Sequence, residues 1–144
     1  MTSLVFPDIN VWVALTLRTH EHYPAAWKWY RQLPENVDLV FCRFTQLGLL
    51  RLLSLKGVAG IETMSQVQAW AAYDKWFDEG GAIFQEEPFG IELEFRSLAN
   101  LSMPAPKDWA DSYLAALAAS TSLPLVTFDR SLGRRIPLSI RLES

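Results

Sequence analysis

Three aspartates, Asp8, Asp111 and Asp129, stand at separated places in a chain of 144 residues. Asp8 follows the apolar run Leu4–Phe6, and Asp129 follows the β-type run Leu123–Phe128. If both runs are strands of one parallel sheet, the two acids lie at the same edge, where such sheets bind ligands. Carboxylates gathered there repel one another, and a divalent cation removes that repulsion. An all-oxygen ligand set suits Mg²⁺ or Mn²⁺ better than zinc.

The third acid stands near the start of an alanine-rich segment, Asp108–Ser120, which we predict to be a helix. Asp111 precedes Leu114 by one turn and lies near the edge of the helix's apolar stripe, so it can point over the end of the sheet. Asp108 lies three residues earlier on the same helical face. We treat Asp108 as a possible further ligand, with a helix cap or a plain surface charge as its alternative roles.

Each aspartate taken alone has a simpler explanation. Asp8 and Asp129 could each cap a following helix, and Asp111 could be an ordinary surface residue. The three together favour a cation site, because two of them follow strands and the third begins a helix.

The remaining elements must bring these acids together. Strands and helices alternate along the chain, which predicts an α/β fold with a mostly parallel sheet. The predicted strands are Leu4–Phe6, Val37–Cys42, Ala82–Gln85, Leu123–Phe128 and Ser139–Leu142. The predicted helices are Asn10–Leu17, His20–Leu33, Gln46–Leu55, Ser65–Glu79, Phe89–Ala99, Asp108–Ser120 and Arg130–Arg134. For Gln46–Leu55 we expect Thr45 as the N-cap and Gly57 as the stop.

Charge is distributed unevenly along the chain, whose net charge is −3. The segment 74–94 carries seven acidic residues against one basic residue, Lys75. The rest of the chain therefore holds 12 basic and nine acidic residues, three of which are the aspartates above. Local field matters more than the net charge, so a nucleic-acid partner is not excluded.

The single cysteine, Cys42, cannot form a disulfide within the chain, which fits a reduced, cytoplasmic setting. No apolar run approaches the roughly 18–20 residues that a membrane helix requires. We therefore expect no membrane association.

Four short motifs, in this order, resemble the PIN domain, and within it the VapC toxins of bacterial toxin–antitoxin pairs. They are Phe6-Pro7-Asp8-Ile9-Asn10-Val11-Trp12, Thr45-Gln46-Leu47-Gly48-Leu49-Leu50-Arg51, Asp111-Ser112-Tyr113-Leu114-Ala115-Ala116 and Leu125-Val126-Thr127-Phe128-Asp129. The resemblance covers essentially the whole chain. It implies a single three-layer α/β/α domain over residues 1–144.

The resemblance also implies roles for individual residues. Asp8, Asp111 and Asp129 match the family's metal-binding and catalytic aspartates. Thr127 matches a hydroxyl residue near the last acid, and Asn10 matches a polar neighbour of the first.

One position departs from the family's common pattern. A glutamate usually stands three residues after the threonine, where this chain has Gly48. The nearest polar side chain is Gln46, and the reading Thr-Gln-x-Gly-x-x-Arg, ending at Arg51, is similar to one branch of VapC-like proteins. The departure leaves the strength of metal binding and the number of metals open, with Asp108 or Gln46 as possible compensation.

The implied activity is a Mg²⁺-dependent endoribonuclease in which a metal-activated water hydrolyses an RNA phosphodiester. Arg51, Arg130 and Arg134 are candidates for binding phosphate, and Arg51 could instead pair with a site carboxylate. The implied partners are RNA, a VapB-like antitoxin and a second copy of the chain, and the many aromatic residues favour such interfaces.

Two other functions are compatible with parts of this pattern. The missing glutamate would fit a catalytically inactive PIN-like module that binds RNA or a protein. A phosphatase or receiver domain would want a second acid two residues after Asp8, and Asn10 stands there instead.

Overall fold

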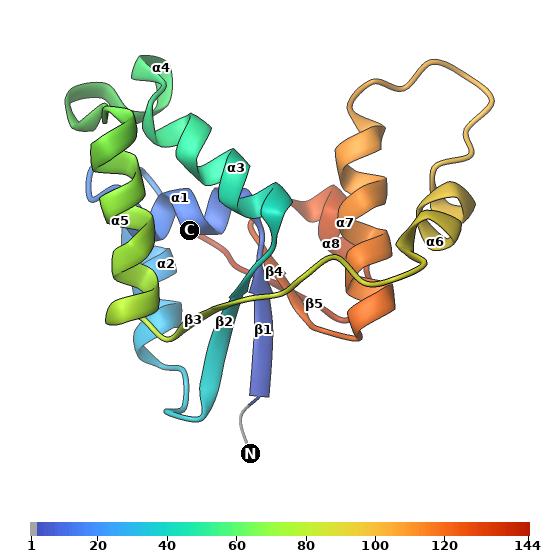
Figure 1. Ribbon diagram of the computed structural model, residues 1–144, viewed down its shortest axis with the longest axis horizontal. Helices are drawn as coiled ribbons and strands as arrows, with labels where there is room; N and C mark the ends of the chain where they lie inside the picture. Colours follow the sequence, from blue (N-terminus) through green and yellow to red (C-terminus); the bar gives the residue numbers. More distant parts are fainter. Residues whose placement is uncertain (1–2) are drawn as a thin grey trace.

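The centre of the computed structural model, which describes residues 3–144, is a five-stranded sheet (Figure 1). Its strands are β1 (Ser3–Pro7), β2 (Val37–Phe41), β3 (Ala82–Phe84), β4 (Leu125–Thr127) and β5 (Ser139–Arg141). Their order is β3-β2-β1-β4-β5, and all four pairings are parallel. The predicted α/β class with a mostly parallel sheet is confirmed. The first two residues of the predicted domain lie outside the described part.

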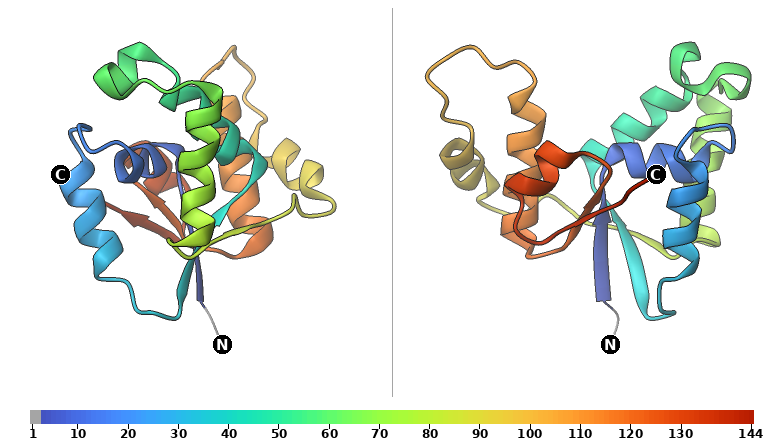
Figure 2. Two further views of the ribbon diagram at one scale, coloured as in Figure 1. Left: turned by 60° about the vertical axis from the view of Figure 1, so that its left-hand side comes forward. Right: turned by 180° about the vertical axis from the view of Figure 1, so that it is seen from behind.

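Helices cover both faces of the sheet, as Figures 1 and 2 show. One face carries α1 (Ile9–Thr16), α2 (Tyr23–Arg31), α3 (Arg43–Leu53) and α5 (Gln66–Asp78). The other carries α6 (Ile91–Leu98), α7 (Asp108–Thr121) and α8 (Arg130–Arg135). A short helix α4 (Lys56–Ala59) and a 3₁₀ turn η1 (Gly60–Glu62) join α3 to α5. The three-layer arrangement is confirmed.

Apolar side chains on both sides of the central strands explain why both faces are covered. Val5 and Phe41 point to the α1 side, while Phe6 and Val40 point to the α7 side. Strands buried on both faces read as continuous apolar runs, which is typical of parallel sheets.

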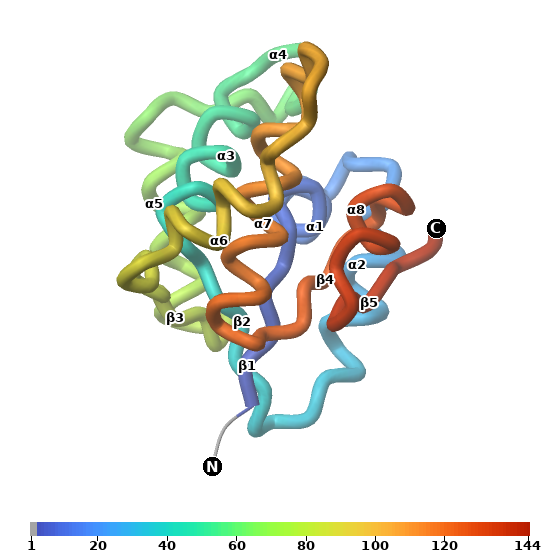
Figure 3. The backbone as a smooth tube through the Cα atoms, turned by 90° about the vertical axis from the view of Figure 1, so that its right-hand side faces the viewer, coloured from blue at the N-terminus to red at the C-terminus, as the bar shows by residue number. Residues whose placement is uncertain are grey.

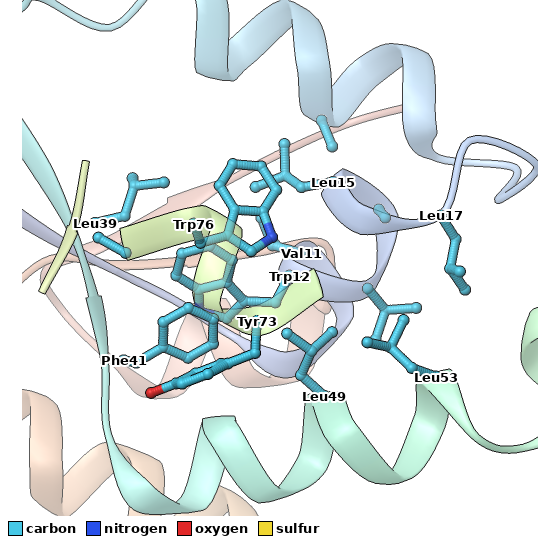
Figure 4. Close-up of a cluster of buried hydrophobic side chains, with 14 of the residues drawn as sticks. Val11, Trp12, Leu15, Leu17, Leu39, Phe41, Leu49, Leu53, Tyr73 and Trp76 are labelled. Carbon is cyan, nitrogen blue, oxygen red and sulfur yellow. The ribbon is translucent and has the colours of Figure 1, made fainter. Parts of the chain in front are cut away.

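The core on the α1 side is built around aromatic rings (Figure 4). The Trp12 ring stacks on Phe41 with centroids 3.8 Å apart, and Trp76 meets Trp12 edge-on at 5.4 Å. These contacts tie α1 and α5 to β2. They hold α1 against the sheet directly behind Asp8.

The core on the α7 side is mainly aliphatic. Leu114 and Leu117 of α7 are buried in one cluster with Phe6 from β1 and Leu125 from β4. This packing sets the position of α7, and therefore of Asp111 in its first turn.

Two predictions for the helix after β2 are wrong. The helix begins at Arg43, with Cys42 as its N-cap, and the Thr45 hydroxyl accepts a hydrogen bond from the Cys42 backbone N–H at 3.0 Å. Thr45 is thus the third residue of a capping box rather than the N-cap, because the extended backbone of β2 continues through Cys42. The helix ends at Leu53, and Gly57 lies inside α4.

The other helices follow the predicted order with shifted ends. The largest shift is in α2, which begins at Tyr23 instead of His20, because the His22 backbone N–H bonds the His20 ring and forms a turn there. No helix within residues 3–144 is long and apolar enough to cross a membrane.

Truncating Leu117 to alanine should lower the free energy of unfolding by about 2–5 kcal/mol, because this side chain is fully buried between α7 and the sheet. Leu93→Ala is the matched control, since Leu93 is 79% exposed on α6 and should change stability by less than about 0.5 kcal/mol. Urea unfolding measures both. Equal effects would contradict this account of the core.

Candidate active site

Asp8 lies at the carboxyl end of β1 and is 7% exposed. It caps α1: its Oδ1 accepts a hydrogen bond from the Ile9 backbone N–H at 2.7 Å. Its Oδ2 accepts a second bond from the Thr127 hydroxyl at 3.0 Å. The Asp8 backbone N–H donates to the Val126 carbonyl oxygen at 2.8 Å, which registers β1 against β4. The carboxylate is therefore held in one orientation from two sides.

Thr127 connects Asp8 to Asp129. Its fully buried hydroxyl donates to Asp8 and also accepts the Asp129 backbone N–H at 3.0 Å. Asp129 itself is exposed and caps α8, with Oδ1 accepting from the backbone N–H groups of Ser131 at 2.8 Å and Leu132 at 3.2 Å. The two strand-end acids thus belong to one hydrogen-bonded unit.

Asp111 is half-buried in the first turn of α7, on the other side of this unit. Burial raises its pKa, and the charge of Asp129 raises it further, while Arg135 opposes the rise. Burial likewise raises the pKa of Asp8, against the effect of its hydrogen bonds, and the charges of Asp129 and Asp111 add to the rise. The three carboxylates therefore lie within electrostatic reach of one another.

Asp108 has a different position from the other three acids. Its Oδ1 pairs with Arg135 at 2.6 Å, and its Oδ2 accepts a hydrogen bond from the Ser112 hydroxyl at 2.7 Å. These two partners, the Ser112 bond first, lower the pKa of Asp108. Arg135 also donates to the Leu98 carbonyl oxygen at 2.9 Å. Arg135 thus joins α8 to α7 through Asp108 and to α6 through Leu98, and both oxygens of Asp108 have partners.

The donor set at the sheet edge fits a hard divalent cation. Three carboxylates supply oxygen ligands, and their mutual repulsion is the penalty that such a cation would remove. The Oδ1 atom of Asn10, two residues after Asp8, is buried and has no hydrogen-bond partner within residues 3–144. In the same described part, no three acidic, histidine or cysteine side chains converge closely enough to hold a metal as they stand. The side chain of Asp129 is instead directed onto α8.

Comparison with known proteins identifies the family of this chain. The PIN domain family model matches residues 5–135. The chain belongs to the PIN domain family. Ribonuclease VapC41 of Mycobacterium tuberculosis is 37% identical to it over 139 residues, which cover 94% of this chain and 95% of the relative.

Solved structures of VapC proteins share the fold. VapC20 of Mycobacterium tuberculosis, described as a toxin that cleaves the sarcin–ricin loop, superposes with a TM-score of 0.66 at 14% identity, covering 92% of this chain and 94% of its own. The VapBC2 complex of Rickettsia felis, bound to a promoter DNA fragment, gives a TM-score of 0.69 at 13% identity, covering 97% and 99%. At these identities the likeness supports the fold alone.

The position of the usual PIN-domain glutamate is occupied from the neighbouring helix. A Cβ atom built on Gly48 would lie 2.3 Å from Ile9 Cδ1 and 2.8 Å from Ile9 Cγ1. These distances are below any real contact, so no larger residue fits at position 48 while Ile9 keeps its place. Ile9 directly follows Asp8, so this packing also positions the start of α1.

The remaining polar residues predicted near the site lie on two helices, α3 and α8. Gln46 is buried on α3, where its Oε1 accepts a hydrogen bond from Arg43 at 2.6 Å. Arg51 is exposed in the last turn of the same helix and makes no ion pair within residues 3–144, so its pairing with a site carboxylate is not observed. Arg130 and Arg134 are both exposed on α8, next to Asp129.

Sequence reasoning missed the roles of three residues that shape the site: Ile9, Ser112 and Arg135, the last of which was considered only as one of several basic residues that could meet phosphate and not as the partner of Asp108. Ser112 had a detectable signal, because it is a polar residue four positions after Asp108 on one helix face. Ile9 and Arg135 had none, since their contacts cross between helices that are far apart in sequence.

Gly48→Ala should destabilise the protein by about 1–3 kcal/mol through overpacking against Ile9. In an Ile9→Ala background the same substitution should instead stabilise by up to about 1 kcal/mol, because alanine is the better helix former and the space is now open. Urea denaturation of the four proteins of this cycle measures the change of sign. Equal effects of Gly48→Ala in both backgrounds would contradict the proposed contact.

The raised pKa of Asp8 predicts a pH dependence of the metal-free protein. Between its ordinary value of 3.8 and the raised folded-state pKa, the folded protein binds more protons than the unfolded chain, so stability falls as the pH rises. Asp8→Asn removes this loss. In EDTA, the Tm of the Asp8→Asn variant should exceed that of the wild type, and this difference should grow as the pH rises above about 4. Replacing EDTA by Mg²⁺ should reduce the difference. A constant margin across the pH range would refute the raised pKa.

Proposed function

We propose that this PIN-domain chain is a divalent-metal-dependent endoribonuclease of the VapC toxin type. The observation that carries the proposal is the unit formed by Asp8, Thr127 and Asp129 at the carboxyl edge of the sheet, with Asp111 facing it from α7. The relative named Ribonuclease VapC41, aligned over 94% of the chain, supports the same activity.

In this proposal Asp8, Asp111 and Asp129 hold Mg²⁺, with Mn²⁺ as an alternative. When bound, the cation activates a water and neutralises charge on the phosphate. Thr127 fixes the Asp8 carboxylate through its hydrogen bond, and the buried Asn10 oxygen offers a further acceptor beside the site. Asp108 does not belong to this set, because Arg135 and Ser112 already occupy its oxygens.

The RNA backbone needs positive charge near these acids. Arg130 and Arg134 are exposed on α8, the helix that begins directly after Asp129. They are the proposed phosphate ligands. Arg51 is a more distant candidate on α3, and Gln46 supports that helix from inside.

The proposed protein partners are a VapB-like antitoxin and a second copy of the chain. The structural neighbour from Rickettsia felis is a VapBC complex, which supports an antitoxin. Large apolar side chains at Ile61, Val67 and Trp109 are exposed and available to such partners. The cytoplasmic location, inferred from the lone Cys42, and the action of residues 1–144 as one domain stay predictions.

A second candidate is a catalytically inactive module that binds RNA or protein. The packing of Ile9 into the place of the usual glutamate favours it, because one acidic ligand is lost. The two candidates differ in one measurable property, metal-dependent turnover.

Asp8→Asn and Asp129→Asn should each lower the rate of RNA cleavage by at least about 100-fold, because each removes one anionic ligand from the site. Cleavage of a labelled RNA mixture is measured with Mg²⁺, with Mn²⁺ and with EDTA, which should abolish it. Asp78→Asn is the matched control, since Asp78 is an exposed aspartate at the end of α5.

The result also separates the two candidates. Metal-dependent cleavage by the wild type that is lost in the site variants supports the enzyme. Binding of RNA without turnover under all metal conditions would instead establish the inactive module.

A further inference from the structure

A pocket of about 380 Å³ lies beside Asp129 on the α1 side of the sheet. It is lined by His22, Phe128, Arg130, Arg141, Leu142 and Glu143, among others. These residues come from the loop before α2, the end of β4, the start of α8 and the segment after β5. Figure 3 shows β5 near α8, with the chain continuing from β5 to the C-terminus, where Ser144 contacts His22. Phe128 and Arg130 flank Asp129 in the sequence, so the pocket is formed in part by the segment that carries Asp129.

One wall of the pocket is an aromatic stack. The His22 ring lies over the Phe128 ring with centroids 4.7 Å apart and planes inclined by 20°. Phe128 is anchored by the core on the α1 side, and His22 is half-exposed above it. Proteins bind the bases of single-stranded nucleic acids by stacking them on aromatic side chains. The His22 ring also lies 5.5 Å from the tilted ring of His20 and is hydrogen-bonded to the Ser144 hydroxyl, which holds it in place.

Two guanidinium groups, those of Arg130 and Arg141, also line the pocket. Arg141 forms an ion pair with Glu143, which partly neutralises it. Arg130 has no ion-pair partner within residues 3–144. The pocket thus combines an aromatic surface with two guanidinium groups, and the Glu143 carboxylate competes for one of them, that of Arg141. A second carboxylate, that of Glu21, lies 3.5 Å from the His22 ring.

We propose that this pocket binds a nucleotide of single-stranded RNA next to the phosphate that is cleaved. The base stacks on the His22–Phe128 pair, and its phosphate binds Arg130 and Arg141 in place of Glu143. The proposal rests on the ribonuclease function proposed above and extends it to His22, Arg141 and Glu143, which lie outside the four family motifs. A stacking wall accepts any base, so the pocket contributes affinity and position rather than strict sequence choice.

The test measures binding in EDTA, so that it does not depend on cleavage. The probe is a fluorescein-labelled oligoadenylate of about ten nucleotides, with fluorescence anisotropy recorded over a series of salt concentrations. Arg130→Ala and Arg141→Ala should each weaken binding about fivefold or more and reduce the slope of log K against log salt by about 0.7. Glu143→Gln should tighten binding, because it releases Arg141.

The exposed pair Arg96–Glu92 on α6 supplies matched controls. Arg96→Ala and Glu92→Gln should leave both affinity and salt slope unchanged. His22→Ala should weaken binding of the oligoadenylate but not of an abasic RNA backbone of the same length, since its contact is with the base. Thermal melting of every variant verifies that it is folded.

Two results would overturn the proposal: Arg141→Ala behaving like Arg96→Ala, or Glu143→Gln failing to tighten binding. Failure of the proposed function gives a different pattern, in which the wild type binds RNA through this pocket but never cleaves it with Mg²⁺ or Mn²⁺. If cleavage is present, the pocket variants should raise KM and leave kcat nearly unchanged, because they bind substrate away from the reacting phosphate.

Discussion

The hydrogen bond from Thr127 to the buried carboxylate of Asp8 is the contact on which the arrangement of the site depends. It joins the ends of β1 and β4, and the same hydroxyl accepts the backbone N–H of Asp129. A buried carboxylate is tolerated only when its oxygens are satisfied, and here Ile9 and Thr127 satisfy them. Asp8 is therefore rigid, while the exposed Asp129 is free to exchange its capping bonds for another ligand.

The rest of the fold supplies the third acid and keeps it in place. The aliphatic core beneath α7 holds this helix against the sheet, and the contacts of Asp108 with Ser112 and Arg135 join it to α8. Asp108 thus joins helices of the fold, while Asp111 on the same helix is half-buried and lies within electrostatic reach of Asp129. The pKa values of Asp8 and Asp111 are raised first by burial and then by the charges of the neighbouring aspartates, and a bound cation would relieve this repulsion.

The departure at Gly48 is a matter of packing as well as chemistry. Ile9 fills the space that a side chain at position 48 would need, so the first helix approaches α3 closely. The close approach of α1 to α3 therefore requires glycine at position 48, where the family resemblance places a glutamate. Because the Ile9 side chain fills the space beside Gly48, no cavity is left at this position.

The sequence by itself determined the α/β class and the order of the elements, and it predicted the three aspartates as a cation site, because strand-end acids and helix periodicity are local patterns. The family followed from four motifs with fixed spacing. Only the tertiary structure decided that Asp108 pairs with Arg135, that Ile9 occupies the place of the glutamate, and that His22 stacks on Phe128 beside Arg141. Each of these contacts joins residues distant in sequence, so its partner depends on how whole helices and strands pack, which no local pattern records.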